Sequence, residues 1–107
     1  MGTRIYVLYR LKDGVSRDQY IDWSLSTDQK ITPGLEAIMR FRVRQVIETI
    51  EGPENQFDII EEIDVTSVED WQRGLESEHM RKVQEEWPHY ADTTSAVIVA
   101  AEPIGSE

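Results

Sequence analysis

Three titratable side chains occupy positions at which acid or base chemistry is possible. Glu61 interrupts an alternating apolar run, and a carboxyl among apolar neighbours has a raised pKa, so it can hold a proton near neutral pH. Asp28 stands near the end of a predicted helix, where a carboxylate can take a proton from a ligand or bind a pyrrole or amine N–H. His79 titrates near neutrality and follows Glu78, which can orient it. We predict Glu61, Asp28 and His79 as catalytic candidates.

Each of these three residues also has a purely structural interpretation. Glu61 can satisfy its hydrogen bonds on Gln45 or on a helix terminus. Asp28 can be an exposed acid, at a helix end where the dipole is unfavourable for an anion. His79 can lie at a pocket rim or on the surface, because the apolar stripe of its helix uses Met80. The residues alone leave both interpretations open.

Aromatic and apolar side chains fall on the faces that would meet between the predicted helices and strands. At helical spacing such aromatic residues form plain core, or else they stack on a flat ligand. We expect a ligand pocket in this layer, because pockets combine an apolar lining with a few polar groups. The predicted substrate contacts are Tyr9, Trp23, Phe41, Gln45, Ile59, Trp71 and Met80.

Composition and motifs exclude several functional classes. The 107 residues include no cysteine, and the two histidines lack the HxH and HxxxH spacings of metal ligands, so we expect no metal. No GxGxxG, P-loop or GxSxG motif is present, and we expect no cofactor. A net charge of −10 argues against nucleic acid and against an anionic membrane surface. With no long apolar run and no signal peptide, we expect a cytoplasmic protein.

The apolar periodicity alternates between strand and helix. A helix begins at Ser16, where Gln19 three residues later completes a capping box, and Pro33 follows its end. A second helix begins at Ser67, slips by one residue around 76–78, and ends at Pro88. The predicted strands are 3–11, 37–50, 57–65 and 95–104.

The element order is βαββαβ, which predicts one α+β domain over residues 1–107 with a ferredoxin-like, antiparallel four-stranded sheet. Pairing odd with odd positions in the central hairpin places Arg44 opposite Glu62 and Arg42 opposite Asp64. The helices can cover only one face of the sheet. The other face would carry apolar residues, and such a patch usually marks an interface, so we expect a homodimer packed through this face. The predicted patch is Tyr6, Leu8, Ile38, Ile60 and Ile98.

Several segments resemble the dimeric α+β-barrel superfamily, within it the REDY-like HapK family and more distantly EthD-type proteins. The resemblance covers residues 4–104. It is carried by VLYRLKDGVS, by FDIIEEIDVTSVEDW, by Tyr20-x-x-Trp23-x-x-x-x-Asp28, and by a Leu75-x-Ser77 break leading to Met80.

The resemblance implies a homodimer with a small-molecule pocket between helices and sheet in each subunit. HapK-like proteins are similar to accessory proteins of pigment and other secondary-metabolite pathways, and Asp28 matches an aspartate of that family. Cousins include cofactor-free polyketide cyclases, quinone-forming monooxygenases and haem-degrading enzymes. The histidine of the cyclases falls at Met80 here, one residue after His79. The haem-degrading relatives have an asparagine on the first helix, whereas the only asparagine here is Asn55, in a turn.

Three functions remain open from the sequence. The first is a cofactor-independent cyclase or monooxygenase-like enzyme of secondary metabolism that acts on an aromatic, polyketide- or pyrrole-type intermediate, with Asp28 or Glu61 as base, His79 as auxiliary group and Tyr9 bonded to a carbonyl. The second is a metabolite-binding or accessory protein that performs no chemistry. The third is a structural dimer with a filled core. The expected partner in the first two is a small apolar or aromatic metabolite.

Overall fold

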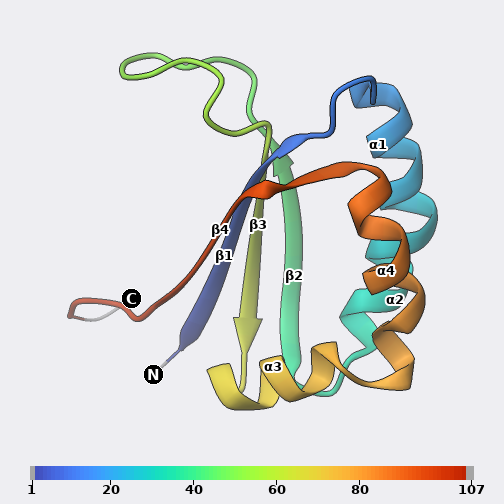
Figure 1. Cartoon of the computed structure of the whole chain (residues 1–107). Helices are drawn as coiled ribbons and strands as arrows, with labels where there is room; N and C mark the ends of the chain where they lie inside the picture. Colours follow the sequence, from blue (N-terminus) through green and yellow to red (C-terminus); the bar gives the residue numbers. More distant parts are fainter. Residues whose placement is uncertain (1, 106–107) are drawn as a thin grey trace.

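Four antiparallel strands form one sheet, which the helices cover on a single face (Figure 1). The computed structural model describes residues 2–105; Met1, Ser106 and Glu107 of the predicted domain lie outside this range. The order in the sheet is β2-β3-β1-β4, as expected for the ferredoxin-like arrangement. The strands are β1 (Thr3–Leu11), β2 (Ile38–Gln45), β3 (Ile59–Val65) and β4 (Ala91–Ala101).

The first helical segment begins where the sequence predicts. Ser16 accepts a hydrogen bond from the Gln19 backbone N–H at 3.1 Å, and the Gln19 side chain accepts one from the Ser16 N–H at 2.8 Å, so the predicted capping box is confirmed. The chain then runs without a gap through α1 (Arg17–Trp23), a π-helical turn (Ser24–Asp28), α2 (Gln29–Ile31) and a 3₁₀ turn (Thr32–Gly34).

The second helical segment is broken, as predicted. Ser67 caps α3 (Val68–Leu75) by accepting a hydrogen bond from the Asp70 N–H at 3.0 Å. A 3₁₀ turn (Glu78–Met80) separates α3 from α4 (Arg81–Glu86), and a further 3₁₀ turn covers Trp87–His89. α1, α2 and α4 lie along one face of the sheet, while α3 crosses its end (Figure 1).

The register of the central hairpin differs from the predicted one by two residues. Odd positions do pair with odd positions, but Arg42, rather than Arg44, lies opposite Glu62. Arg44 still reaches Glu62 diagonally, at 3.4 Å. Asp64 is bound by Arg4 of β1 at 2.7 Å. The predicted strands 37–50 and 57–65 were too long, because residues 46–58 form an irregular loop and alternation does not fix where pairing stops.

The uncovered face of the sheet carries a different apolar set from the predicted one. Ile38 is only 8% exposed and belongs to the core, because a register shift between Ile38 and Arg40 turns it toward the helices. Ile98 lies opposite Val7, and therefore also on the helix side. The pairing instead places the following residues on the uncovered face, named here the open-face patch: Tyr6, Leu8, Ile60, Val97 and Val99.

The last strand begins earlier in the chain than predicted. β4 begins at Ala91 rather than at residue 95 and ends at Ala101. Its pairing with β1 is interrupted between Leu8 and Arg10, where the register shifts. None of the helices in residues 2–105 is both long and apolar enough to cross a bilayer.

Candidate functional site

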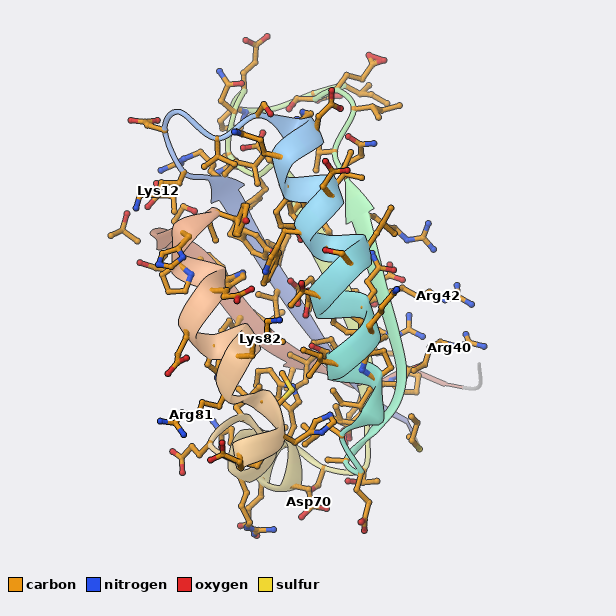
Figure 2. All side chains as sticks on the ribbon, turned by 90° about the vertical axis from the view of Figure 1, so that its right-hand side faces the viewer. Lys12, Arg40, Arg42, Asp70, Arg81 and Lys82 are labelled. Atoms are coloured by element: carbon orange, nitrogen blue, oxygen red, sulfur yellow. The ribbon has the colours of Figure 1, made fainter. Side chains whose placement is uncertain are left out.

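A cavity of about 100 Å³ lies between the helical layer and the sheet. Its wall is apolar and aromatic apart from two carboxyls, one hydroxyl and one amide. No Lys, Arg or His lines it, and the labelled Arg40, Arg42 and Arg81 point outward in Figure 2. The lining residues are Val7, Asp28, Thr32, Phe41, Glu61, Ile63, Trp71, Leu75, Met80, Val83, Gln84, Trp87 and Ile98.

Glu61 reaches this cavity from the middle of β3. It is paired with Val7 on one side and Val43 on the other, so strand alternation directs its side chain toward the helices. The residue is 8% exposed, and its Oε2 accepts a hydrogen bond of 2.6 Å from the Tyr9 hydroxyl. Burial raises the pKa of the Glu61 carboxyl, the nearby Asp28 charge raises it further, and the Tyr9 hydrogen bond opposes both.

Asp28 reaches the same cavity from the helical layer. It is the last residue of the π-helical turn and is 3% exposed, so the alternative of an exposed acid does not hold, and the predicted helix end at this position is wrong. The helical chain continues through Gly34, and Thr32, four residues on, donates a 2.6 Å hydrogen bond to Asp28 Oδ1. Burial raises the pKa of Asp28, and the bond from Thr32 lowers it.

The two carboxyls form a pair with raised pKa values at one apolar cavity. Each favours the neutral form of the other, since Asp28 and Glu61 bear like charges when ionised. Such a pair retains a proton at a higher pH than a solvent-exposed carboxyl does. One member can therefore act as a base while the other remains an acid. Among residues 2–105, no group of three acidic or histidine side chains is arranged to hold a metal.

The structure brings some of the predicted contacts to the cavity. Phe41, Trp71 and Met80 line it, whereas Tyr9 lies outside the lining, 0% exposed, and its hydroxyl binds the lining residue Glu61. These residues come from β1, β2, α3 and the 3₁₀ turn before α4, so the helix break and the sheet together position them.

Other predicted contacts lie elsewhere. Gln45 is exposed and accepts a 3.3 Å hydrogen bond from Arg17, so it does not bind Glu61. Ile59 is buried beside Gln45, outside the cavity lining. Trp23 donates its indole N–H to Glu86 at 2.8 Å, on the far side of the helical layer.

His79 also lies outside the cavity lining. It is exposed, and its Nε2 lies 2.6 Å from the carbonyl oxygen of Ile31. Because a carbonyl only accepts, this ring nitrogen donates the bond. His79 therefore ties the 3₁₀ turn before α4 to the end of α2, which is a structural contact.

The prediction of site residues missed four of the residues that shape the cavity or its hydrogen bonds. Thr32 lies four residues after Asp28, a spacing that signals contact on a helix. Tyr20 bonds the Tyr9 hydroxyl at 2.7 Å, and its helical face was visible in the sequence. Trp87 and Gln84 line the cavity from the end of the second helical segment; the sequence places Trp87 on the apolar stripe with Met80, whereas nothing in it singles out Gln84.

Comparison with known proteins adds a family and a fold. The family model described as REDY-like protein HapK matches residues 3–104. The crystal structure of HapK from Hahella chejuensis is similar, with a TM-score of 0.78 and 20% identity over 98% of this chain and 95% of that one. A sequence comparison with curated proteins finds no match.

Two further solved structures share the fold. An EthD family protein from Bacillus halodurans C-125 has a TM-score of 0.75 and 13% identity, covering 97% of this chain and 100% of that chain. A protein from Thermobifida fusca, described as a dimeric ferredoxin-like protein, has a TM-score of 0.74 and 16% identity, covering 96% and 92%.

Proposed function

The chain belongs to the REDY-like HapK family, and on that premise we propose that it is a small-molecule enzyme of secondary metabolism. It acts without a cofactor on an aromatic, polyketide- or pyrrole-type intermediate, as a cyclase or monooxygenase-like protein. The observation that carries the proposal is the pair Asp28 and Glu61, two buried carboxyls with raised pKa values on one apolar cavity. Titratable groups with pKa values raised by burial in a cavity are typical of sites of acid–base chemistry.

The proposed chemistry is proton transfer next to a carbonyl group. The ionised carboxylate removes a proton from the carbon between or beside carbonyls, and the protonated member of the pair donates its proton to the carbonyl oxygen, which yields the enol. The enol carbon then attacks a carbonyl carbon of the same molecule and closes a ring, and the π bond of that carbonyl breaks. The carboxyl that took the carbon-bound proton protonates the new alkoxide, and the enol O–H proton returns to the carboxylate that gave it, so both acids regain their starting states. The aromatic walls Phe41, Trp71 and Trp87 exclude water and hold a flat substrate against the carboxyls.

The functional unit in this proposal is a homodimer. The open-face patch has no helix over it (Figure 1), and ion pairs between Arg4 and Asp64 and between Arg44 and Glu62 flank it. A second copy packed through the same face would bury the apolar side chains, and an isologous contact closes at two subunits. The fold neighbour described as dimeric supports this arrangement.

The experiment uses pentane-2,4-dione, the smallest β-diketone unit of a polyketide. Deuterium uptake at its central carbon, followed by NMR in heavy water near neutral pH, reports proton removal. We expect the wild-type protein to accelerate uptake above the buffer rate, and Glu61→Gln and Asp28→Asn each to lose about 10²-fold or more of that acceleration. The control variants Asp22→Asn and Glu48→Gln change exposed acids, and we expect both to accelerate deuterium uptake as the wild type does. Equal uptake in all five proteins would overturn the enzymatic proposal.

A second candidate function is binding without chemistry. It is favoured by the observation that both carboxyls already have hydrogen-bond donors within the protein, Tyr9 and Thr32. In that case pentane-2,4-dione or pyrrole binds the cavity, seen as chemical-shift changes at Trp71 and Met80. Deuterium uptake then stays at the buffer rate in every variant.

A further inference from the structure

We propose that Tyr9 and Tyr20 relay protons between Glu61 and a second, solvent-facing hollow. This inference rests on the proposed function, because it concerns how the same carboxyl regains or loses its proton. The relay makes Tyr9 and Tyr20 functional groups rather than core residues. It also separates the path of the proton from the path of the substrate.

Short hydrogen bonds join the Glu61 carboxyl and the hydroxyls of Tyr9 and Tyr20. The Tyr9 hydroxyl donates to Glu61 Oε2 at 2.6 Å and lies 2.7 Å from the Tyr20 hydroxyl. Ser24 contributes a further hydroxyl beside Tyr20, and Ser24 Oγ accepts from Gln29 Nε2 at 3.0 Å. With Glu61 ionised, Tyr9 uses its proton on the carboxylate and can then only accept from Tyr20, so both tyrosine protons are directed toward Glu61.

The inner part of this chain is shielded from water. Tyr9 is 0% exposed, and Tyr20 and Ser24 are each 2% exposed. Packing also fixes the two rings, since Tyr9 meets the edge of Tyr20 at 6.2 Å and of Trp87 at 5.2 Å between ring centroids. Fixed hydroxyls at hydrogen-bond distance are the arrangement that proton transfer requires.

The outer end of the chain opens into a hollow of about 210 Å³ that shares no lining residue with the first cavity. Tyr20, Ser24 and Gln29 line it together with the exposed Gln45 and Leu25. A hollow of this size with several polar groups can hold water. Water at Ser24 or Tyr20 is therefore the proton donor and acceptor at this end.

The transfer balances without any charged tyrosine. A hydronium ion in the hollow gives a proton to Tyr20 and becomes water, the Tyr20 proton passes to Tyr9, and the Tyr9 proton passes to Glu61, which becomes neutral. Both hydroxyls are neutral before and after, which suits them because burial raises the pKa of both tyrosines. The charged or titratable groups facing Glu61 and Tyr20 are each other, Tyr9, and Asp28 of the π-helical turn.

The test measures how fast Glu61 exchanges its proton, with no substrate present. In protein labelled with ¹³C at the glutamate carboxyls, NMR titration gives the midpoint of Glu61, and relaxation dispersion near that midpoint gives the exchange rate. We expect Tyr20→Phe, which keeps the ring and removes the hydroxyl, to slow exchange about tenfold or more. Tyr90→Phe is the matched control, because the Tyr90 ring stacks on Trp23 outside the relay, and its rate stays at the wild-type value.

The titration midpoint of Glu61 tests the proposed function, and its proton-exchange rate tests the relay. A raised midpoint with an unchanged exchange rate in Tyr20→Phe would overturn the relay and leave the proposed function standing. A midpoint at the ordinary glutamate value would remove the basis of the proposed function itself. Ser24→Val, which removes the outer hydroxyl and places methyl groups toward the hollow, gives an independent measurement: slowed exchange supports the relay, and wild-type exchange in a folded Ser24→Val protein contradicts it.

Discussion

Glu61 shows how the surroundings of one side chain decide its chemistry. Its neighbour Glu62 has the same carboxyl, but it points to the other face of the sheet and meets Arg44 there. Glu61 instead meets the Tyr9 hydroxyl and the Asp28 carboxyl in a buried setting, which raises its pKa. The alternation of the strand is therefore what separates a surface ion pair from a candidate base.

The raised pKa values predict an unusual dependence of stability on pH. The pKa values of Glu61 and Asp28 lie above the ordinary 4.5 and 3.8, so the folded state binds more protons than the unfolded chain does. The stability they contribute is present below the ordinary pKa and is lost as pH rises through the raised one. We expect the free energy of unfolding of Glu61→Gln to fall less with rising pH than that of the wild type, by about 1.4 kcal/mol for each pH unit by which the Glu61 pKa is raised. Urea unfolding at several pH values measures this difference.

The matched control for that measurement is Glu48→Gln, in an exposed position of the loop after β2. It keeps the wild-type pH profile. A wild-type protein whose unfolding free energy rises through this range, or a Glu61→Gln profile that runs parallel to it, contradicts the assignment. Stability lost at acidic pH has a different source, Asp64. Its hydrogen bond from Arg4 lowers the pKa of Asp64, so the stability that this ion pair contributes disappears as pH falls.

At the scale of elements, two helical irregularities build the site. The π-helical turn at Ser24–Asp28 carries Ser24, Thr27 and Asp28 on its buried side. The 3₁₀ turn at Glu78–Met80 brings Met80 to the cavity after α3 has ended. π-Helical turns are uncommon and often occur at functional sites.

The contact between the 3₁₀ turn at Glu78–Met80 and the end of α2 leads to a prediction. His79 Nε2 donates to the Ile31 carbonyl at 2.6 Å and so joins the second helical segment to the first. We expect His79→Ala to lower the free energy of unfolding by about 0.5–1.5 kcal/mol, because one hydrogen bond is lost at a partly solvated position. His89→Ala changes the other, exposed histidine and leaves stability within about 0.5 kcal/mol of wild type. Equal effects of the two changes in urea unfolding would contradict this role for His79.

The sequence predicted most of these elements because their signals are local. Ser16 with Gln19, and Ser67 before α3, mark helix starts through groups three residues apart. The alternation of β3 correctly placed Glu61 among apolar neighbours. The register shift after Ile38 depends on the pairing partner, as does the face on which Ile98 lies, so periodicity within one segment could not reveal them. Gln45 was misplaced because it is the last residue of β2, where its side chain is exposed rather than buried beside Glu61.

At the scale of the whole molecule, the sheet has one covered and one uncovered face. The covered face holds the core and the cavity, and the uncovered face holds the open-face patch. Val97 and Val99 on β4 are 44% and 45% exposed in the single chain. An apolar surface on a central sheet is rarely left in water, which is why a second copy is the expected cover.

The dimer proposal predicts a change of mass on one substitution. Leu8 lies on β1 in the middle of the open-face patch. We expect Leu8→Glu to convert the protein from two chains to one in sedimentation or light scattering, because a carboxylate without a partner would be buried in the apolar contact. Ile47→Glu introduces the same charge in the exposed loop after β2, where Ile47 is 86% exposed, and leaves the mass unchanged. A wild-type protein of single-chain mass would remove the dimer from the proposed function.

The placement of the three tryptophans gives the protein a built-in optical signal. Trp71 and Trp87 form part of the cavity wall, whereas the Trp23 indole is engaged by Glu86 and stacks on Tyr90 at 5.0 Å between ring centroids. A molecule entering the cavity would change the emission of the first two and leave the third as an internal reference. Fluorescence quenching, without any label, can therefore screen metabolites against this chain.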